Sequence, residues 1–287
     1  HIIPTLIIAA IFIFNYTHTF AAYYYASQFG TEGVGNGQFS YPRHIAQDAS
    51  GNLYVTDNGN SRVQKFDSNG NYISQFGVYG TGDGEMYDPD GIQIVGSNLY
   101  LVEGINNRVQ IFDLSGNYVS KFGTPGTGDG EFDHPSDIAI DTSGNMYVTD
   151  KLNNRVQKFN SSGVFVSTFG TSGSATGEFI FPESIDFHED YLYVSDTSNN
   201  RIQKLDLSGN FVSTFGEYGE GPGYFLNPVG IAFDSNDNMY IVDSGNNRVQ
   251  KFDSSGNFIM TFSGPGIANG KLSSPVDIVL NSSDELV

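Results

Sequence analysis

A repeat of 46 to 47 residues constrains what this chain can fold into more than any other feature of its sequence. The clearest marker of the repeat is a proline that stands three residues after an apolar residue. These prolines are Pro42, Pro89, Pro135, Pro182, Pro228 and Pro275. A second marker, an arginine before a short predicted strand, recurs with the same spacing at Arg62, Arg108, Arg155, Arg201 and Arg248. Two markers that share one spacing indicate that the chain repeats a single structural unit.

Each unit contains four short segments of alternating or apolar residues, as expected for strands. In the third unit these segments are residues 134–141, 144–150, 153–160 and 163–170, and Gly, Asn, Asp and Ser separate them. The 35 glycines, 17 tyrosines and 23 phenylalanines of the chain suit tight turns and strands. Four-stranded antiparallel sheets that repeat at this length are typical of the blades of a β-propeller, and the alternation excludes helical repeats.

The unit resembles the NHL repeat, which runs from a proline-led first strand, through a strand that ends in Asp, to an Asn-x-Arg-Ile-like turn. In the third unit Pro135, Asp150 and residues 153–156 carry this resemblance, which extends from about Ser40 to the C-terminus. Asn-Arg-Val or Asn-Arg-Ile stands where the name of the family implies Asn-His-Leu. The resemblance implies six blades, so the predicted fold is all-β, a six-bladed β-propeller of four-stranded antiparallel blades.

The two ends of the repeat region predict how the ring closes. Residues 25–30 match residues 72–77, the fourth strand of the first unit, although no first three strands precede them. The final unit, residues 274–287, has a first strand and part of a second. We therefore expect Tyr25–Phe29 to complete the truncated last blade, so that residues 22–287 form five full blades and a partial sixth. Because the third strand is missing, we interpret the sequence as a fragment cut before the native end of the protein. A longer native protein with more blades is the open alternative.

Residues 1–21 are interpreted as a signal peptide or an N-terminal membrane segment. Residues 1–14 are apolar apart from His1 and Thr5, and no Asp, Glu, Lys or Arg precedes Glu32. The stretch is short for a membrane span, and Thr19-Phe20-Ala21 offers small residues where a signal peptidase reads them. We expect cleavage and a secreted or cell-surface protein, while an uncleaved segment predicts membrane association. The chain contains no cysteine, which excludes disulfides and thiolate chemistry.

The net charge of −19 argues against nucleic acid as a partner, because affinity for nucleic acid depends on cationic side chains that neutralise phosphates. Some cytoplasmic NHL proteins bind RNA, and this acidic chain is a poor match for that role.

The acidic residue at the end of each second strand is interpreted as structural. Because it recurs beside the repeated arginine, we expect it to pair with that arginine or to accept backbone N–H bonds once per blade. The residues assigned to this repeated motif are Asp57, Arg62, Arg108, Asp150, Arg155, Asp196, Arg201, Asp243 and Arg248, with Glu103 in place of Asp in the second unit.

A binding site is expected where the units differ. The residues directly after the marker prolines are Arg43, Asp90, Ser136, Glu183, Val229 and Val276, and the next are His44, Gly91, Asp137, Ser184, Gly230 and Asp277. These residues lead into the innermost strands, so one hypothesis is a polar pocket with Arg43, Asp90 and Glu183 opposed across the channel. The alternative is a solvated rim. The ligand-binding candidates are Arg43, His44, Asp90, Ser136, Asp137 and Glu183.

No catalytic residue, metal site or cofactor is predicted. Amidating lyases with this repeat bind zinc through histidines after the proline, and His44, His134 and His188 fall elsewhere in their units. Lactonase-like calcium enzymes use Glu, Asn and Asp in the channel, which Glu183, Asp137 and Asp277 imitate only loosely. Asp83 and Asp129 offer calcium one carboxylate per loop, whereas such a site takes about six to eight oxygens.

The leading functional hypothesis is a binding or scaffold module for a protein, peptide or glycan, acting through the channel mouth and loops. A metal-dependent lyase or hydrolase with a channel site is the alternative, and a non-enzymatic role is favoured.

Overall fold

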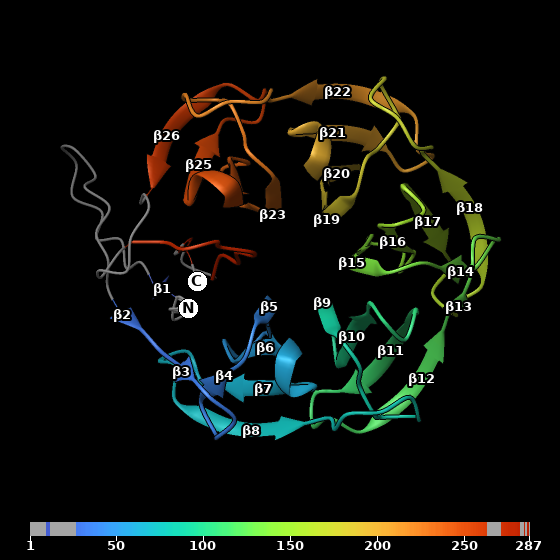
Figure 1. The fold of residues 1–287 in the computed structure, drawn as a ribbon, viewed down its shortest axis with the longest axis vertical. Helices are drawn as coiled ribbons and strands as arrows, with labels where there is room; N and C mark the ends of the chain where they lie inside the picture. Colours follow the sequence, from blue (N-terminus) through green and yellow to red (C-terminus); the bar gives the residue numbers. More distant parts are fainter. Residues whose placement is uncertain (1–9, 12–26, 263–270, 282–283, 285, 287) are drawn as a thin grey trace, which may run out of the picture.

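Strands build this protein in the order that the repeat predicts. The computed structural model describes residues 10–11, 27–262, 271–281, 284 and 286. Four-stranded sheets stand side by side in a ring, and each is a meander in which the first strand lies nearest the centre and the fourth lies at the outer edge (Figure 1). This confirms the prediction of an all-β propeller with four-stranded antiparallel blades.

Five blades are complete. Blade 1 consists of β5 (Pro42–Gln47), β6 (Leu53–Asp57), β7 (Arg62–Phe66) and β8 (Tyr72–Phe76). Blade 2 consists of β9 (Pro89–Val95), β10 (Asn98–Glu103), β11 (Arg108–Asp113) and β12 (Tyr118–Phe122). Blade 3 consists of β15 (Pro135–Ile140), β16 (Met146–Asp150), β17 (Arg155–Phe159) and β18 (Phe165–Phe169).

Blade 4 consists of β19 (Pro182–His188), β20 (Tyr191–Asp196), β21 (Arg201–Asp206) and β22 (Phe211–Phe215). Blade 5 consists of β23 (Pro228–Phe233), β24 (Met239–Asp243), β25 (Arg248–Phe252) and β26 (Phe258–Phe262). Short parallel pairs join blades, namely β3 (Thr31–Glu32) with β4 (Gln38–Phe39), and β13 (Thr124–Pro125) with β14 (Glu131–Phe132). Three single-turn 3₁₀ helices, η1 (Asn58–Asn60), η2 (Thr197–Asn199) and η3 (Ser244–Asn246), link second strands to third strands.

The hydrophobic core lies between neighbouring blades. Tyr54 and Val63 of blade 1 pack in one buried cluster with Leu99, Leu101 and Phe112 of blade 2. Because both faces of a middle strand meet a neighbouring blade, all five residues of β6 are buried. The second strand of this blade is therefore buried along its whole length, whereas the outer strand β8 exposes its three central residues.

The outer strands of blades 1 to 4 each pack against the next blade through a phenylalanine that lies over a glycine. Phe76 of blade 1 lies over Gly116 of blade 2, where an added Cβ would stand 2.4 Å from Phe76 Cγ. Gly116 also has a φ of +85°, a conformation that residues with a Cβ rarely adopt. Gly116 is thus required both by backbone conformation and by close packing.

The acidic residue of each repeat lies at the centre of a buried hydrogen-bond network. Asp57 is fully buried and accepts hydrogen bonds from Arg62 Nε at 2.7 Å, Gln64 Nε2 at 3.0 Å and the Ser40 N–H at 2.7 Å. Arg62 also donates to backbone carbonyls of the preceding loop, including that of Gln38. Equivalent acid and arginine pairs occur at Glu103 with Arg108, Asp150 with Arg155, Asp196 with Arg201 and Asp243 with Arg248.

The partial sixth blade lies between blade 5 and blade 1. The Ile45 N–H of blade 1 donates a 2.9 Å hydrogen bond to Asp277 Oδ2. On the other side, the Ser274 N–H donates to Asn247 Oδ1 of blade 5. Residues 271–281 therefore stand in the first-strand position of a sixth blade, in accordance with the predicted truncated last blade.

β2 (Ser27–Gln28) lies at the outer edge of that blade position, and β1 (Ala10–Ile11) lies on its inner side (Figure 1). β2 pairs antiparallel with β1, with Ala10 opposite Gln28. Phe29 lies over Gly70 of blade 1, as Phe76 lies over Gly116. Tyr25 and Ala26 of the predicted closing strand lie outside the described residues, as does the predicted signal segment apart from β1. Among the residues that the structure describes, no helix is long and apolar enough to cross a membrane.

Candidate functional site

A β-bulge lies directly after the marker proline in each of the five complete blades. In blade 1, Pro42 pairs with Asp57 and Ile45 pairs with Val55, so β5 has one more residue than β6 over this interval. Blades 2 to 5 show a register shift at the corresponding place. A bulge bends its strand and redirects side chains. The bulged positions are those at which the sequences of the units differ.

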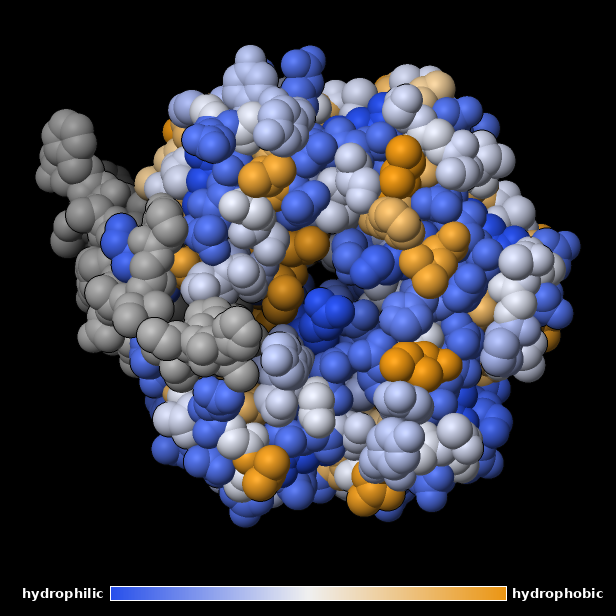
Figure 2. Space-filling model, viewed as in Figure 1, coloured by the Kyte–Doolittle hydropathy of each residue, from blue (hydrophilic) through white to orange (hydrophobic). Residues whose placement is uncertain are grey.

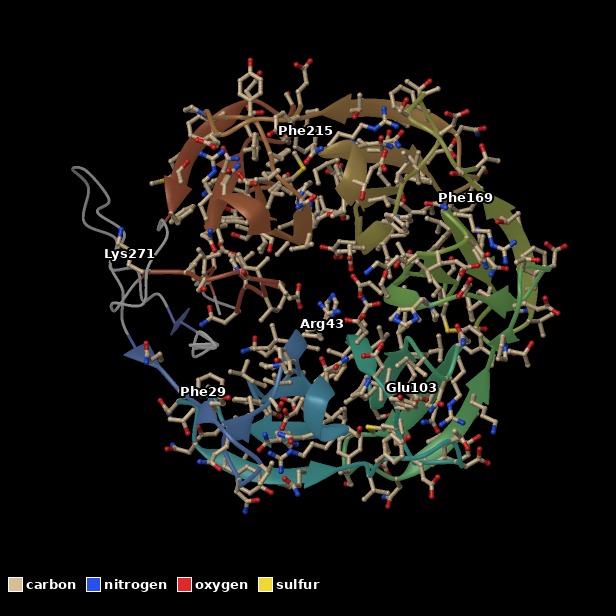
Figure 3. The ribbon with its side chains drawn as sticks, viewed as in Figure 1. Phe29, Arg43, Glu103, Phe169, Phe215 and Lys271 are labelled. Carbon is tan, nitrogen blue, oxygen red and sulfur yellow. The ribbon has the colours of Figure 1, made fainter. Side chains whose placement is uncertain are left out.

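A cavity of about 430 Å³ opens at this end of the ring, and residues from blades 1 to 5 and from the partial sixth blade line it. Arg43 lies at the centre of the ring, whereas Phe29, Phe169 and Phe215 lie near its outer edge (Figure 3). Figure 2 shows that this face is hollowed at its centre, where hydrophilic residues meet apolar ones. The cavity is therefore bounded by non-repeated residues and not by the repeated motif.

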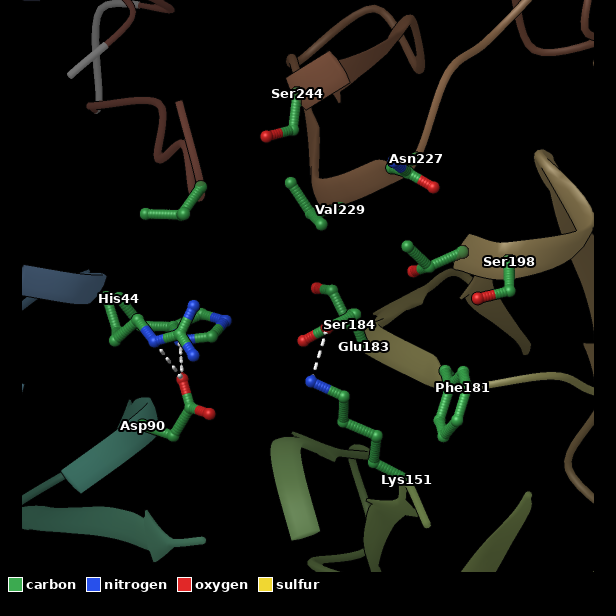
Figure 4. Close-up of a pocket in the computed structure, with 13 residues that line it drawn as sticks. His44, Asp90, Lys151, Phe181, Glu183, Ser184, Ser198, Asn227, Val229 and Ser244 are labelled. Atoms are coloured by element: carbon green, nitrogen blue, oxygen red, sulfur yellow. Dashed lines mark ion pairs between the residues drawn. The ribbon is translucent and has the colours of Figure 1, made fainter. Parts of the chain in front are cut away.

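Three cationic and two acidic side chains line one part of the cavity. Asp90 lies 3.1 Å from His44 Nδ1 and 3.8 Å from Arg43 Nε. Lys151 Nζ lies 2.5 Å from Glu183 Oε1, and both side chains point into the cavity (Figure 4). Arg43 and Asp90 are thus neighbours that pair with each other, whereas the hypothesis from the sequence has them opposed across the channel.

Apolar and neutral polar residues line the remaining part. Val229 of blade 5 and Val276 of the partial sixth blade supply the apolar wall. Ser198, Asn227 and Ser244 add hydroxyl and amide groups around it (Figure 4). The cavity thus combines ion pairs, neutral hydrogen-bonding groups and an apolar wall, which is the composition of sites that orient a ligand by a few polar contacts.

In the wall of the cavity, His44 lies among several carboxyl groups. Burial lowers the pKa of His44, but the charges of Asp277 and Asp137 and the contact with Asp90 outweigh it and raise the pKa to about 10. Desolvation raises the pKa of Asp277 to about 6. Desolvation, with the charges of Asp137 and Asp277, also raises the pKa of Asp186 to about 8. At neutral pH His44 is therefore a buried cation, and Asp186 holds a proton.

Ser136 and Asp137, the other candidates from the sequence, do not line the cavity. Asp137 Oδ2 accepts hydrogen bonds from Ser184 Oγ at 2.7 Å and from the Ile185 N–H at 3.1 Å. Ser136 Oγ donates a 2.6 Å hydrogen bond to the Glu183 carbonyl. Both residues are buried and join blade 3 to blade 4.

Sequence reasoning missed two sets of loop residues that line the cavity. Lys151, Thr197 and Ser244 each follow directly after the acidic residue of a second strand, and this position varies among the units as strongly as the one after the proline. Phe181 and Asn227 precede their prolines and have φ values of 50°. Variation at like positions of the repeat is the signal that identifies both sets.

Comparison with known proteins agrees with this architecture. A family model described as a 6-bladed beta-propeller matches residues 86–146 and 182–269, more than half of the chain. A model of the NHL repeat matches residues 39–66. Protein brain tumor of Drosophila melanogaster is 37% identical over 71 residues, which is 25% of this chain and 7% of that relative.

Solved structures share the fold at low identity. A streptogramin B lyase superposes with a TM-score of 0.63 at 15% identity, covering 85% of this chain and 89% of the lyase. A chain of a nidogen/laminin complex superposes with a TM-score of 0.63 at 16% identity, covering 86% of this chain and 88% of that chain. At such identities the likeness shows the fold alone. With the family match, it establishes that this chain belongs to the 6-bladed β-propeller family and is built from NHL repeats.

Proposed function

We propose that this protein is an exported binding module that captures a protein or peptide ligand in the cavity at the channel mouth. One observation carries the proposal. The residues that differ between blades line one cavity, whereas the repeated residues form the contacts that hold the blades together. A feature present in every repeat serves the repeat, so residues that depart from it at like positions are those available for recognition.

The chemistry of the cavity favours a peptide segment with charged and apolar side chains. Lys151 and Arg43 supply cations next to acidic partners, so an incoming carboxylate or ammonium group exchanges one ion pair for another. Val229 and Val276 offer an apolar surface beside these charges. A volume of about 430 Å³ accommodates one or two side chains of a loop.

The surroundings of the cavity also suit a macromolecular ligand. Tyr41 and Phe181 are 65% and 40% exposed, and they directly precede the prolines of blades 1 and 4. Exposed aromatic residues around a polar pocket are common in protein interfaces. The nidogen/laminin structure contains a protein complex, which supports the same use of the fold here.

The test is selection of a phage-displayed peptide library against the purified protein, followed by titration of the selected peptide. We expect Arg43→Gln combined with Lys151→Gln to weaken binding at least tenfold. The matched control is Lys121→Gln, which removes a cation of the outer strand β12, far from the cavity. Selected peptides that bind the double variant and the Lys121→Gln control equally well contradict the proposal. If no peptide is selected and a glycan array gives binding instead, the ligand is a glycan and not a peptide.

Export is the second part of the proposal, and the apolar character of residues 1–14 supports it. N-terminal sequencing of the protein isolated from its source tests it. A mature N-terminus close to Ala21 outside the cell is expected, whereas an intracellular protein that retains residues 1–21 contradicts it.

A channel lyase or hydrolase is the second candidate, and the perturbed cluster of His44, Asp186 and Asp277 favours it. Clusters of shifted pKa values are enriched at active sites. The test is an assay of hydrolysis or lysis with a panel of lactones and esters. Activity that is lost both on chelation with EDTA and in the His44→Gln variant supports an enzyme. The absence of activity contradicts it.

A further inference from the structure

A second cluster of ligating side chains lies at the opposite end of β19 from the cavity. Glu183 stands near the start of β19 and His188 at its end, and seven strand residues span roughly 20 Å. The turn after His188 carries Glu189, and the turn between β23 and β24 of blade 5 brings Asp237 beside it. The cluster is therefore separate from the proposed binding cavity.

The three side chains converge closely enough to share one ion. Each offers one ligand atom, and these atoms lie within 4.8 Å of one another. His188 Nε2 lies 3.0 Å from Asp237 Oδ1, and the Asp237 side chain is 50% exposed. Within the part of the chain that the structure describes, this is the single group of three such side chains that meets this geometry.

The imidazole of His188 is held in the orientation that ligation needs. It stacks on the ring of Phe233, with ring centroids 4.0 Å apart and planes at 4°. Phe233 in turn packs against Tyr193, which is 4% exposed. A ligand that is already fixed by packing loses little side-chain entropy when an ion binds.

The two carboxylates occupy positions that hold glycine in other blades. Asp237 has a φ of 62°, and the same turn position in blades 1 and 3 is taken by Gly51 and Gly144. Glu189 has a φ of 55°, and its counterpart in the turn of blade 2 is Gly96 with a φ of 61°. The repeat thus does not require a carboxylate at either place, and glycine fits both backbones.

We propose that His188, Glu189 and Asp237 bind a divalent transition-metal ion of the Zn²⁺ type and thereby tie the turns of blades 4 and 5 together. One imidazole nitrogen and two carboxylate oxygens are a ligand set that Zn²⁺ accepts, with water in the open position. Ca²⁺ is disfavoured, because it takes about six to eight oxygen ligands and no nitrogen. The ion neutralises two negative charges on a protein with a net charge of −19.

The test is calorimetric titration of the chelator-treated full chain with ZnCl₂, with CaCl₂ titrated in parallel. We expect one Zn²⁺ ion per chain, little heat with Ca²⁺, and a higher Tm in the presence of Zn²⁺. Asp237→Gly and Glu189→Gly remove ligands without straining the turns, so both variants fold, and each is expected to bind Zn²⁺ at least tenfold more weakly. His188→Ala is expected to do the same.

The control is Asp129→Asn, which removes an exposed carboxylate from a connecting loop and leaves Zn²⁺ binding unchanged. If the wild type and both glycine variants bind Zn²⁺ equally well, the ions bind adventitiously to an acidic surface, and the proposal is overturned. Failure of the wild type to bind Zn²⁺, or binding of Ca²⁺ with the same affinity, overturns it as well.

Discussion

Phe29 packs against Phe66 with ring centroids 4.9 Å apart, and Phe76 packs against Phe112 in the same way at 5.2 Å. Phe76 belongs to the outer strand of blade 1 and Phe112 to the third strand of blade 2. Phe29 therefore contacts blade 1 in the way that Phe76 contacts blade 2. This relationship places Phe29 at the outer edge of the sixth blade position.

Phe29→Ala is predicted to destabilise the protein by about 3 kcal/mol, because it removes a ring packed on Phe66 and Gly70 and leaves a cavity. Phe76→Ala is the matched variant at an ordinary blade junction and is expected to cost a similar amount. Urea unfolding of the two variants measures both values. A neutral Phe29→Ala beside a destabilising Phe76→Ala means that the N-terminal segment does not close the ring.

Asp150→Ala is predicted to cost about 3–5 kcal/mol of folding free energy, because it leaves Arg155 without its buried partner. Asp150 is fully buried and accepts hydrogen bonds from Arg155 Nε at 2.7 Å and from the Asp133 N–H at 2.8 Å. Asp129→Ala, at an exposed position, is expected to stay within about 0.5 kcal/mol of the wild type. Unfolding free energies that are equal for the two variants contradict a structural role for the repeated acid.

Stability is predicted to fall as the pH rises from about 4 to 8. The pKa of Asp186 is about 8 and that of Asp277 about 6 in the folded protein, both above the value of about 3.9 for an unfolded aspartate. The folded state therefore binds more protons than the unfolded state in this range, and raising the pH favours unfolding. His44, with a pKa of about 10, stabilises the fold below about pH 6.5 and loses this contribution towards pH 10.

Asp186→Asn isolates this effect, because an amide resembles the protonated carboxyl group and does not titrate. The variant is expected to have a higher Tm than the wild type at pH 8 and a flatter dependence of Tm on pH between 5 and 8. Differential scanning calorimetry across this range provides the measurement. If the curves of Tm against pH are parallel for the variant and the wild type, the prediction is wrong, because other groups then cause the pH dependence.

The fold was predictable because the residues that mark the repeat are those that form its contacts. Pro42 starts the inner strand and Arg62 binds the buried Asp57, so their regular spacing reports the spacing of the blades. Phe29 was recognisable because residues 25–30 match a complete outer strand. Such features recur in every unit, and recurrence distinguishes them from chance.

The candidate site was predictable only in part. Arg43, His44 and Glu183 stand at positions that the repeat directs to the channel, and they line the cavity. Asp137 shares the position of His44, yet it does not line the cavity and accepts a hydrogen bond from Ser184. Which variable residues reach the opening and which bond between blades depends on the packing of adjacent blades, and spacing along the chain does not contain that information.

The cluster of His188, Glu189 and Asp237 escapes sequence analysis for a related reason. Its members belong to two units, and His188 and Asp237 are 49 residues apart in the chain. They lie in turns of different length, and these turns become neighbours only when blades 4 and 5 pack side by side in the ring.

The most direct test of the account is binding of a selected peptide to Val229→Trp, a variant that fills the apolar side of the cavity and leaves the ion pairs in place. The account predicts that the dissociation constant rises at least tenfold while the Tm stays within a few degrees of the wild type. An unchanged dissociation constant in a folded Val229→Trp protein contradicts it, because the ligand then binds elsewhere on the propeller.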